Sequence, residues 1–545
     1  MNFKLKFTAI FSAILFLNFN VFSQQIKMVN TDSIPRFWYL LDLEIDGYPG
    51  ISLKKAYELM KGKQSTSLIV AVIDVGVDTL HRDLKNILWI NSGEIPGNGI
   101  DDDHNGYIDD NHGWNFLGNQ NGRNVTKDTN ESERIYDRLK KKFVSSEMGD
   151  KLILADPDYR LWMEVSKSAE ARSSAIKRLL PGLKSSLNNM SVANELLKQE
   201  IKKDTITGFD VEKYSPSNNL LKYAKIGVVN KMRASGQLGF RTDKYIAGLN
   251  EYITSLEKEI SIENHVINYR GEVVCDNYQD INDRFYGNNN IMAENPFHGT
   301  HVSGIIGGTS NDKIGVKGIA NNIRIMNIRA VPDGDEHDKD VALAIRYAVN
   351  NGARIINMSF GKRLSPEKIW VDDAIEYAES KGVLIINAAG NDHTDIDEEP
   401  NYPNKIRKNG KFASNMLTVA ASKIPDENGD YIYDNTNYGQ KNVDVFAPGM
   451  DIYSSAPGNT YVKATGTSMA APIVTGIAAL ILEYYPNLTP LQLKDIILKS
   501  SVKPMELVKS PGPYNIGKVR LSELCLSGGI VNAYEAMRLA ESYRQ

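Results

Sequence analysis

The sequence has few cysteines and no excess of charge of either sign. Only two of its 545 residues are cysteines, Cys275 and Cys525, so a disulfide framework of the kind that holds small secreted domains is excluded. An exported chain could join the two cysteines in one disulfide, but two free, buried thiols are the simpler interpretation of two cysteines so far apart in the sequence. The formal net charge is −4, and no run of Lys and Arg alternates with aromatic residues. We therefore expect no nucleic-acid partner, because such partners are held by a basic surface.

Long apolar runs are also scarce. The first residues combine Lys4 and Lys6 with an apolar run over residues 7–17, followed by the small residues Val21 and Ser23 at the spacing of a signal-peptidase site. This run is shorter than the roughly 20 residues that span a bilayer. We expect residues 1–23 to be a signal peptide and the protein to be exported, periplasmic or extracellular. No later segment looks long and apolar enough to span a membrane, so we expect no membrane span after cleavage.

What the sequence does have is a regular alternation of short apolar runs and amphipathic stretches, within a composition that is 42% hydrophobic and 24% charged. The apolar runs are continuous and rich in β-branched residues, which is typical of strands buried on both faces. Helical patterns lie between them, over residues 339–352 and 365–382. The pattern predicts an α/β fold with a doubly wound parallel sheet. The predicted strands are residues 67–74, 323–330, 354–361, 383–391, 416–422 and 443–449.

Three polar residues lie at the ends of these elements, where ligands collect in parallel sheets. Asp74 closes the first apolar run, and Asn391 follows another in "NAAGN". Ser468 lies in "GTSMAAP" at the start of a long apolar helix, where a hydroxyl is exposed and the helix end is partly positive. Taken singly, each has an ordinary alternative: a turn cap for Asp74, turn chemistry for Asn391 and a helix cap for Ser468. Together they supply a nucleophile, an oxyanion donor and a carboxylate.

Two of the chain's eight histidines, His298 and His301, are three residues apart in "NPFHGTHVSGIIGG". They could be a metal pair, a catalytic base beside a bystander, or packing residues. A metal site needs a third ligand, and neither an H-E-x-x-H motif nor a nearby pair of cysteines supplies one. A metal-binding pair is therefore the weakest of the three interpretations.

Five segments, "AVIDVGVD", "HGTHVSGIIGG", "INMSFG", "NAAGN" and "GTSMAAPIVTGIAAL", resemble successive motifs of the subtilisin family of serine endopeptidases. Their order is the Asp…His…Ser order of that family. In an α/β-hydrolase the triad residues would instead follow the order Ser…Asp…His, with the serine in a G-x-S-x-G motif. In this chain Ala470 occupies the position of the last glycine of that motif. The resemblance covers residues 68–124 and 286–545, and "GGIVNAYEAM" is similar to the closing segment of such catalytic domains.

The resemblance implies a secreted serine endopeptidase that acts on polypeptides and requires no cofactor for its chemistry. It makes His298 the base and His301 a buried neighbour one helical turn along. One departure is Ile473, where family members usually carry His after the proline, and it lies within the helix. The implied catalytic residues are Asp74, His298, Ser468 and Asn391, and the implied substrate-binding residues are Ser359, Phe360, Gly361, Ala389 and Gly390.

The second departure is the long separation of Asp74 and His298, which implies an insertion over residues 125–285. Its segments 158–203 and 243–264 have helical apolar spacing, so we expect a mainly helical subdomain. It could restrict the access of folded proteins to the cleft. Alternatively, the chain is a catalytically silent binding protein that uses the insertion as its interaction surface. The expected divisions are a signal peptide (1–23), an N-terminal extension with the first helix and no separately folding pro-domain (24–67), the catalytic domain (68–124 and 286–545) and the insertion (125–285).

An acidic loop, "GNGIDDDHNGYIDDNHGW", partly matches a calcium-binding pattern. Asp101, Asp103, Asn105 and Asp109 fall at positions 1, 3, 5 and 9 of an EF-hand loop, with Gly106 at position 6. His112 stands where the pattern requires a bidentate Glu, so the match is partial. An acidic surface turn would explain the segment equally simply, but adjacent carboxylates repel one another unless a cation or solvent screens them. We predict a structural Ca²⁺ ion here.

Overall fold

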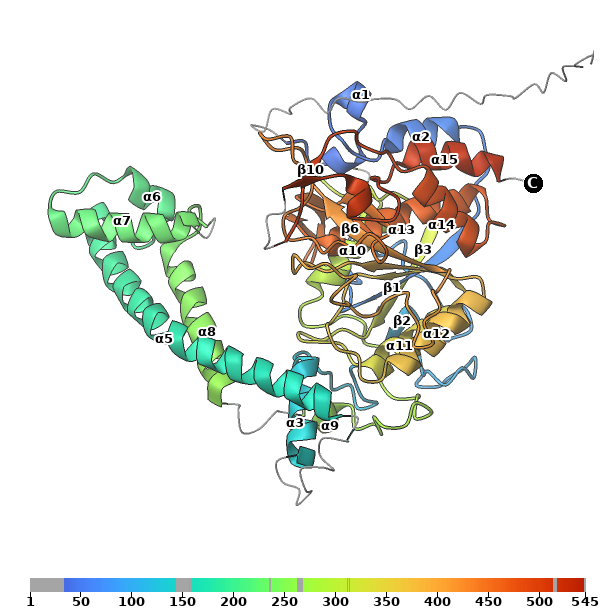
Figure 1. Ribbon diagram of the computed structural model, residues 1–545, viewed down its shortest axis with the longest axis horizontal. Coiled ribbons are helices and arrows are strands. Elements are labelled where there is room, and N and C mark those ends of the chain that lie inside the picture. The colour runs from blue at the N-terminus through green and yellow to red at the C-terminus, as the bar shows by residue number, and fades with distance from the viewer. Residues whose placement is uncertain are drawn as a thin grey trace, which may run out of the picture. The chain divides into compact units, whose positions relative to one another are not determined.

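The computed structural model describes residues 34–143, 156, 158–234, 237–261, 268–310, 312, 314–512 and 517–543 (Figure 1). The expected signal peptide lies outside the described residues. The chain divides into two compact units. The first, which we call the sheet unit, consists of Met1–Gly122, Asn277–Val331 and Asp338–Gln545, and the helical unit consists of Arg123–Asp276 and Pro332–His337.

A parallel sheet of seven strands forms the centre of the sheet unit, in the order β2-β3-β1-β4-β5-β6-β7. All six predicted apolar runs form strands of this sheet, which confirms the predicted fold class. The edge strand β2 was not predicted, because three residues carry no recognisable period. The strands are β1 (Leu68–Asp74), β2 (Gly113–Asn115), β3 (Ile323–Arg329), β4 (Ala353–Met358), β5 (Leu384–Ala388), β6 (Met416–Ser422) and β7 (Val445–Pro448).

Helices cover both faces of the sheet (Figure 1). On one side α11 (Asp338–Asn350) packs against α12 (Lys368–Ser380). On the other, α10 (Phe297–Gly307) packs against the central helix α13 (Thr467–Tyr484). Outside α13 lie α2 (Leu53–Leu59), α14 (Pro490–Lys499) and α15 (Ala533–Ser542). The smaller elements of this unit are η2 (Trp38–Leu40), α1 (Leu43–Asp46), the antiparallel pair β8 (Ile452–Ala456) and β9 (Thr460–Ala464), the pair β10 (Val508–Lys509) and β11 (Lys518–Val519), and η4 (Leu521–Glu523).

Helix α13 is apolar on all sides because it is enclosed between the sheet and the outer helices. Within the described residues it is the one helix whose length and composition would allow it to cross a membrane, which the sequence interpretation had overlooked. Since 89% of that window is buried inside the protein, α13 has the burial of a core helix.

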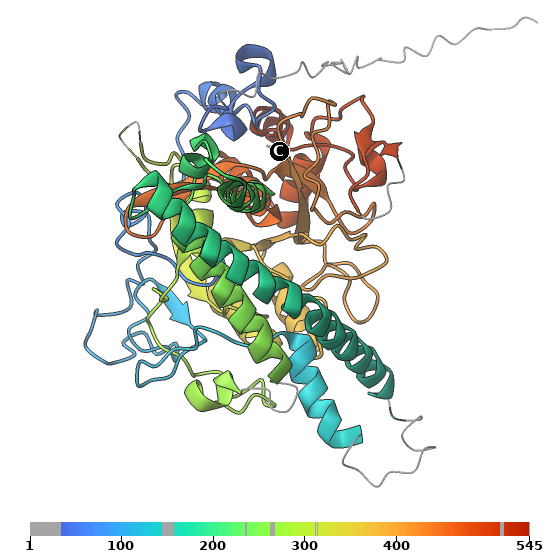
Figure 2. The same cartoon turned by 90° about the vertical axis from the view of Figure 1, so that its left-hand side faces the viewer.

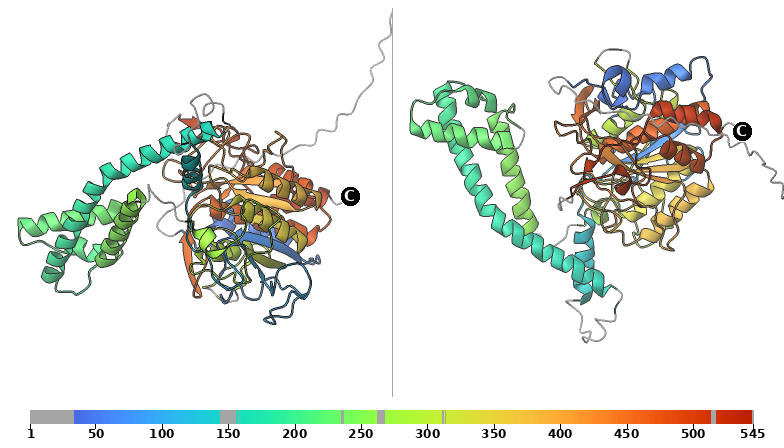
Figure 3. Two further views of the ribbon diagram at one scale, coloured as in Figure 1. Left: turned by 90° about the horizontal axis from the view of Figure 1, so that it is seen from below. Right: turned by 45° about the horizontal axis from the view of Figure 1, so that its top comes forward.

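The helical unit is built around two long helices, α5 (Tyr159–Ile201) and α8 (Thr242–Ser261), which lie side by side (Figures 2 and 3). At one end of this pair, α6 (Gly208–Lys213) and α7 (Asn219–Ala234) pack on α5 and on each other. The remaining helices are α3 (Glu131–Phe143) and α9 (Tyr269–Val273). The predicted helical insertion is therefore confirmed. Its small core is formed by Met190, Leu197, Ile206, Val211, Val228, Val229 and Met232.

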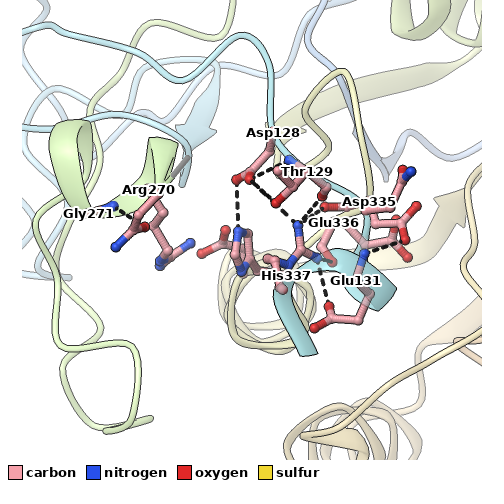
Figure 4. A network of polar contacts seen from close by, with 12 residues as sticks. Asp128, Thr129, Glu131, Arg270, Gly271, Asp335, Glu336 and His337 are labelled. Carbon is pink, nitrogen blue, oxygen red and sulfur yellow. Dashed lines mark hydrogen bonds and ion pairs between the residues drawn. The ribbon is translucent and has the colours of Figure 1, made fainter. Parts of the chain in front are cut away.

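A polar network joins the two chain segments of the helical unit (Figure 4). Asp128 accepts a hydrogen bond of 2.9 Å from Nε2 of His337, and both side chains are buried. Arg134 donates to the carbonyls of Asp335 and Glu336 at 3.0 and 3.1 Å. Burial alone would raise the pKa of the Asp128 carboxyl. The hydrogen bond and charge of His337, together with the charge of Arg134, outweigh burial, so the pKa of Asp128 is lowered. The segment Pro332–His337 connects β3 to α11 along the chain. Because it makes these contacts, it belongs to the helical unit and not to the sheet that it connects.

Both cysteines are free thiols. Cys525 is buried as expected, but Cys275 is exposed. The expectation of two buried thiols was therefore wrong for Cys275, which follows the short helix α9 in a turn with φ of 60° rather than in a core element.

Candidate active site

Asp74 and His298 form the centre of the candidate site. Asp74 is the last residue of β1, and His298 lies in the first turn of α10. Nδ1 of His298 is 2.8 Å from Oδ1 and 2.9 Å from Oδ2 of Asp74. Because an ionised carboxylate only accepts hydrogen bonds, Nδ1 carries the proton and Nε2 is left to act as a base.

A glycine permits this close approach of helix and strand. A Cβ at Gly299 would lie 2.1 Å from the carbonyl oxygen of Gly76 and 3.2 Å from Cβ of Asp74. Asp74 is further positioned by Val75, whose N–H donates to Oδ1 at 2.8 Å. The "HG" of the sequence motif therefore has a steric reason: only glycine after His298 lets α10 reach the end of β1.

The environment of His298 favours its charged form. Burial of the imidazole lowers its pKa, but the charge of Asp74 and the hydrogen bond to it act in the opposite direction, and the pKa of His298 is raised above 6.5. The Asp74 side chain is 3% exposed and that of His298 is 31% exposed, so the imidazole is open to solvent on one side. This arrangement stabilises the imidazolium that forms when a base takes up a proton.

Ser468 is the second residue of α13, where the N–H groups of the first turn have no partner within the helix. Its Oγ donates to the carbonyl of Ser359 at 3.0 Å, and Oγ of Ser359 donates to the carbonyl of Ser468, also at 3.0 Å. The structure thus places the Ser468 hydroxyl on a backbone acceptor rather than on His298. Catalytic hydrogen bonds are often long or unformed without substrate, and a rotation about one side-chain bond redirects Oγ.

Asn391 lies directly beside the start of α13. Its Oδ1 accepts hydrogen bonds from the N–H of Thr467 at 2.9 Å and from Oγ1 of Thr467 at 3.2 Å. With Oδ1 engaged in this way, the amide group is oriented so that Nδ2 can donate elsewhere. Thr467 was not among the residues singled out from the sequence, although its place immediately before Ser468 would have suggested a supporting role.

The two segments expected to bind substrate follow β4 and β5. Ala389 and Gly390 are held by two asparagines that the sequence did not single out: Nδ2 of Asn401 and Nδ2 of Asn437 donate to the Ala389 carbonyl at 3.1 and 2.9 Å. A Cβ at Gly390, whose φ is 103°, would lie 2.3 Å from Nδ2 of Asn437. In the other segment, a Cβ at Gly361 would lie 2.6 Å from Nδ2 of Asn401. Phe360, between Ser359 and Gly361, is half-buried.

His301 is one turn along α10 from His298 and is fully buried. Its Nε2 is 3.2 Å from the carbonyl of Val462. Burial is the main cause that lowers the pKa of His301 to about 4; the hydrogen bond to Val462 opposes this shift, and the neighbouring His298 contributes to it. His301 is therefore neutral at physiological pH, with a ring nitrogen bonded to backbone.

The acidic loop brings Asp101 and Asp103 together with Glu94, and their ligand oxygens lie within 4.8 Å of one another. The calcium pattern did not include Glu94. Asp109 accepts hydrogen bonds from the N–H groups of Gly97, Asn98 and Gly99. Nδ2 of Asn105 bonds to carboxylates at Asp103 and Asp110. Glu94 also accepts hydrogen bonds from the N–H groups of Asp102, Asp103 and Asp109, so these carboxylates hold the loop together, and the loop places Glu94 beside Asp101 and Asp103.

Comparison with known proteins gives the family of the chain. Residues 65–518 match the model of the subtilase family. A thermophilic serine proteinase from Bacillus sp. (strain AK1) is 38% identical over 185 residues, which are 34% of this chain and 42% of that protein. Thermitase from Thermoactinomyces vulgaris is 34% identical over 198 residues, covering 36% of this chain and 65% of thermitase. The chain thus spans less than two thirds of the length of these relatives.

A solved structure of proteases from Pseudoalteromonas arctica PAMC 21717 aligns with a TM-score of 0.45 and 20% identity, covering 93% of this chain and 98% of that one. The family model carries the assignment, because it covers well over half of the chain. The protein belongs to the subtilase family.

Proposed function

We propose that this protein is a serine endopeptidase that hydrolyses peptide bonds through Asp74, His298 and Ser468. The observation that carries the proposal is the hydrogen bond of 2.8 Å between Asp74 and Nδ1 of His298, in a chain whose Ser468 begins α13 beside Asn391. A histidine held against a buried carboxylate is not specific by itself, because His337 and Asp128 form such a pair in the helical unit, and it is the combination with Ser468 and Asn391 that supports a peptidase.

The proposed reaction begins with the attack of Ser468 Oγ on a substrate carbonyl carbon. Nε2 of His298 takes the hydroxyl proton and later gives it to the leaving amine. Asp74 keeps the proton of the imidazole on Nδ1 and stabilises the charged ring. Water then attacks the acyl-enzyme with His298 again as base, and Ser468 is released.

The oxyanion that forms in each step would be stabilised by Nδ2 of Asn391 and the N–H of Ser468. The orientation of Asn391 by Thr467 supports this role, because Oδ1 is already engaged and only Nδ2 can donate. Removing one such donor typically lowers turnover about 100- to 1,000-fold. Ser359, Phe360 and Gly361 would pair with the substrate backbone, and Ala389 and Gly390 would line the pocket for the side chain before the scissile bond.

A fluorophosphonate probe tests the proposal. We expect it to label the purified protein and to leave Ser468→Ala unlabelled, with hydrolysis of a peptide amide lost in the same variant. Circular dichroism would show that both proteins are folded. If the folded wild-type protein took up no label, the alternative would hold, a catalytically silent protein that uses the helical unit as a binding surface.

We further propose that the loop of Glu94, Asp101 and Asp103 holds a structural Ca²⁺ ion. Carboxylate oxygens are the ligands that this hard cation prefers, and the side chains of this set converge. The ion would stabilise the loop that follows β1 and would take no part in peptide hydrolysis. We also propose that the protein is exported after removal of residues 1–23, and N-terminal sequencing of secreted protein would test this.

A further inference from the structure

Asn401 lies between the two segments that are expected to bind substrate. The backbone of the next residue, Tyr402, pairs with that of Lys362 through N–H···O bonds of 2.8 and 2.9 Å, and this pairing sets Asn401 beside Gly361. A Cβ at Gly361 would lie 2.6 Å from Nδ2 of Asn401. The same nitrogen donates to the carbonyl of Ala389 at 3.1 Å. The Asn401 amide therefore occupies the space between one segment and the other.

Asn401 also lines a cavity of about 70 Å³ in the sheet unit. A cavity of roughly 150 Å³ admits benzene, so this one has room for part of a large side chain. Neither Gly361 nor Ala389 is among the described residues that line it, whereas Asn401 is in contact with both. The Asn401 side chain thus separates the cavity from the two segments. Other residues of its wall are Asn387 of β5, Thr418 of β6, Ile396, Ile406 and Asn442.

The position of Asn401 is fixed by its surroundings. Nδ2 of Asn404 donates to the Asn401 carbonyl at 3.1 Å. Lys362, which pairs with Tyr402, is itself held by a salt bridge of 2.9 Å to Asp338, and both of these side chains are 2% exposed. Moving the Asn401 amide aside would break its hydrogen bond to Ala389, which costs free energy because that carbonyl is buried. Asn401 is therefore a wall that a substrate does not readily displace.

We propose that Asn401 restricts the site to substrates with a small side chain, that of Gly, Ala or Ser, before the scissile bond. The inference rests on the proposed function, because it takes residues 359–361 and 389–390 as the segments that bind substrate. A leucine or phenylalanine side chain that extends between these segments would overlap with the Asn401 amide, and overlap in a close-packed pocket is destabilising. The cavity behind Asn401 is the room that a larger side chain would need and does not reach.

Three peptide amides that differ only in the residue before the scissile bond, which is Ala, Leu or Phe, test the proposal. We expect kcat/KM of the wild type to be at least about tenfold higher for the Ala peptide than for the Phe peptide, because a pocket that is too small for one extra group discriminates by about this factor. Asn401→Ala joins the cavity to the pocket. It should raise the ratio of kcat/KM for Phe to that for Ala by about tenfold or more.

Two matched variants separate the size of Asn401 from its hydrogen bond and from the volume of the cavity. Asn401→Leu keeps about the same bulk and removes the hydrogen bond to Ala389, so the Phe to Ala ratio should stay within about threefold of the wild type. Ile406→Ala enlarges the cavity and leaves Asn401 in place, and its ratio should also stay within about threefold. Circular dichroism would show which variants are folded.

Binding to Ser468→Ala gives the same comparison without hydrolysis, with peptides that end in Ala or Phe as the products of such cleavage would. If the wild type took up no fluorophosphonate and cleaved no peptide, but Ser468→Ala bound the Ala peptide more tightly, only the peptidase proposal would fail. The inference on Asn401 is overturned if the Phe peptide is cleaved or bound as well as the Ala peptide, a result that needs no Asn401 variant to fold. It is also overturned if neither peptide is cleaved or bound, if Asn401→Ala leaves the ratio unchanged, or if Asn401→Leu shifts it as far as Asn401→Ala does.

Discussion

Asp74 and His298 are 224 positions apart in the sequence, yet Oδ1 of Asp74 lies 2.8 Å from Nδ1 of His298. Most of the helical unit lies between these two positions in the chain, from Arg123 to Asp276. The end of β1 and the first turn of α10 bring the two side chains together, and the inserted chain leaves and returns without separating them. The chemistry and the insertion can accordingly be tested by separate variants.

The pH dependence of peptide hydrolysis should report the pairing of Asp74 with His298. A general base acts in its neutral form, and the pKa of His298 is raised above 6.5. We expect kcat/KM to rise with pH through a midpoint above 6.5. Asp74→Asn removes the charge that raises this pKa, so its residual activity, lower by about 10,000-fold, should have its midpoint at lower pH. An unchanged midpoint in folded Asp74→Asn would mean that another group controls the profile.

Asn391 and Thr467 should differ in their effect on turnover. Asn391→Ala removes the proposed oxyanion donor and should lower kcat about 100- to 1,000-fold with little change in KM. Thr467→Val removes the Oγ1 contact to Asn391 and the hydrogen bond that Oγ1 accepts from the N–H of Gly390, and it keeps the Thr467 N–H that also holds Oδ1. Its kcat should fall less than about tenfold. Steady-state kinetics on one peptide amide would measure both, and a larger loss in Thr467→Val than in Asn391→Ala would contradict the donor role of Asn391.

His301 should affect stability and not chemistry. Its pKa is about 4 in the folded protein and 6.5 ordinarily, so between these values the unfolded chain binds the proton that the folded protein refuses. The free energy of unfolding should therefore fall by up to about 3 kcal/mol as the pH is lowered from 6.5 to 4. The effect of His298 on the free energy of unfolding has the opposite sign, because the stability that its raised pKa contributes is lost as the pH rises through that pKa.

His301→Gln should remove the His301 part of this slope in urea titrations at several pH values, and should keep most of the activity at pH 8. His298→Ala, by contrast, should lose several orders of magnitude in kcat/KM. A folded His301→Gln as inactive as His298→Ala would show that the roles of the two histidines had been assigned in the wrong order.

Calcium should stabilise the acidic loop through Glu94, Asp101 and Asp103. We expect excess Ca²⁺ to raise the melting temperature relative to EGTA, and Glu94→Gln and Asp103→Asn to reduce that difference. Asp109→Asn is the informative control, because Asp109, like Glu94, holds three backbone N–H groups but lies outside the set of converging carboxylates. It should lower the melting temperature with Ca²⁺ and with EGTA alike. A wild-type protein with the same melting temperature in both conditions would exclude the ion.

The sequence predicts the strands well because each is a local apolar run, and it predicts the insertion as helical because α5 and α8 have a clear period. The sequence predicts less about contacts between residues that are far apart along the chain, and about contacts that depend on the exact course of the backbone. Glu94 could not be chosen from the sequence, because it precedes the acidic run and only the folded loop brings its carboxylate beside Asp101 and Asp103. Nor does any pattern in Pro332–His337 indicate that it pairs with residues around Asp128, some 200 positions earlier.

The last prediction concerns the pair of helices α5 and α8. The insertion leaves and re-enters the chain between Asp74 and His298, which are adjacent in the site, so we expect the helical unit to restrict large substrates more than small ones. Lys184 of α5 and Glu257 of α8 form a salt bridge across the pair. A short Gly/Ser linker in place of residues 185–256 can therefore join the two helices without strain, and it leaves the network of Asp128, Arg134 and His337 intact.

This deletion should raise the rate of cleavage of a large folded protein relative to that of a short peptide amide. A variant in which Leu220, Tyr223 and Ile226, exposed residues of α7, are replaced by Gln is the matched control, because it keeps the bulk of the helices and changes only their surface, so its ratio of rates should equal that of the wild type. The network around His337 remains in both proteins. A change in the hydrolysis of the peptide amide would therefore not result from disruption of this network. If the ratio in a folded deletion stayed at the wild-type value, the helices would not limit access, and binding would be the remaining role for the helical unit.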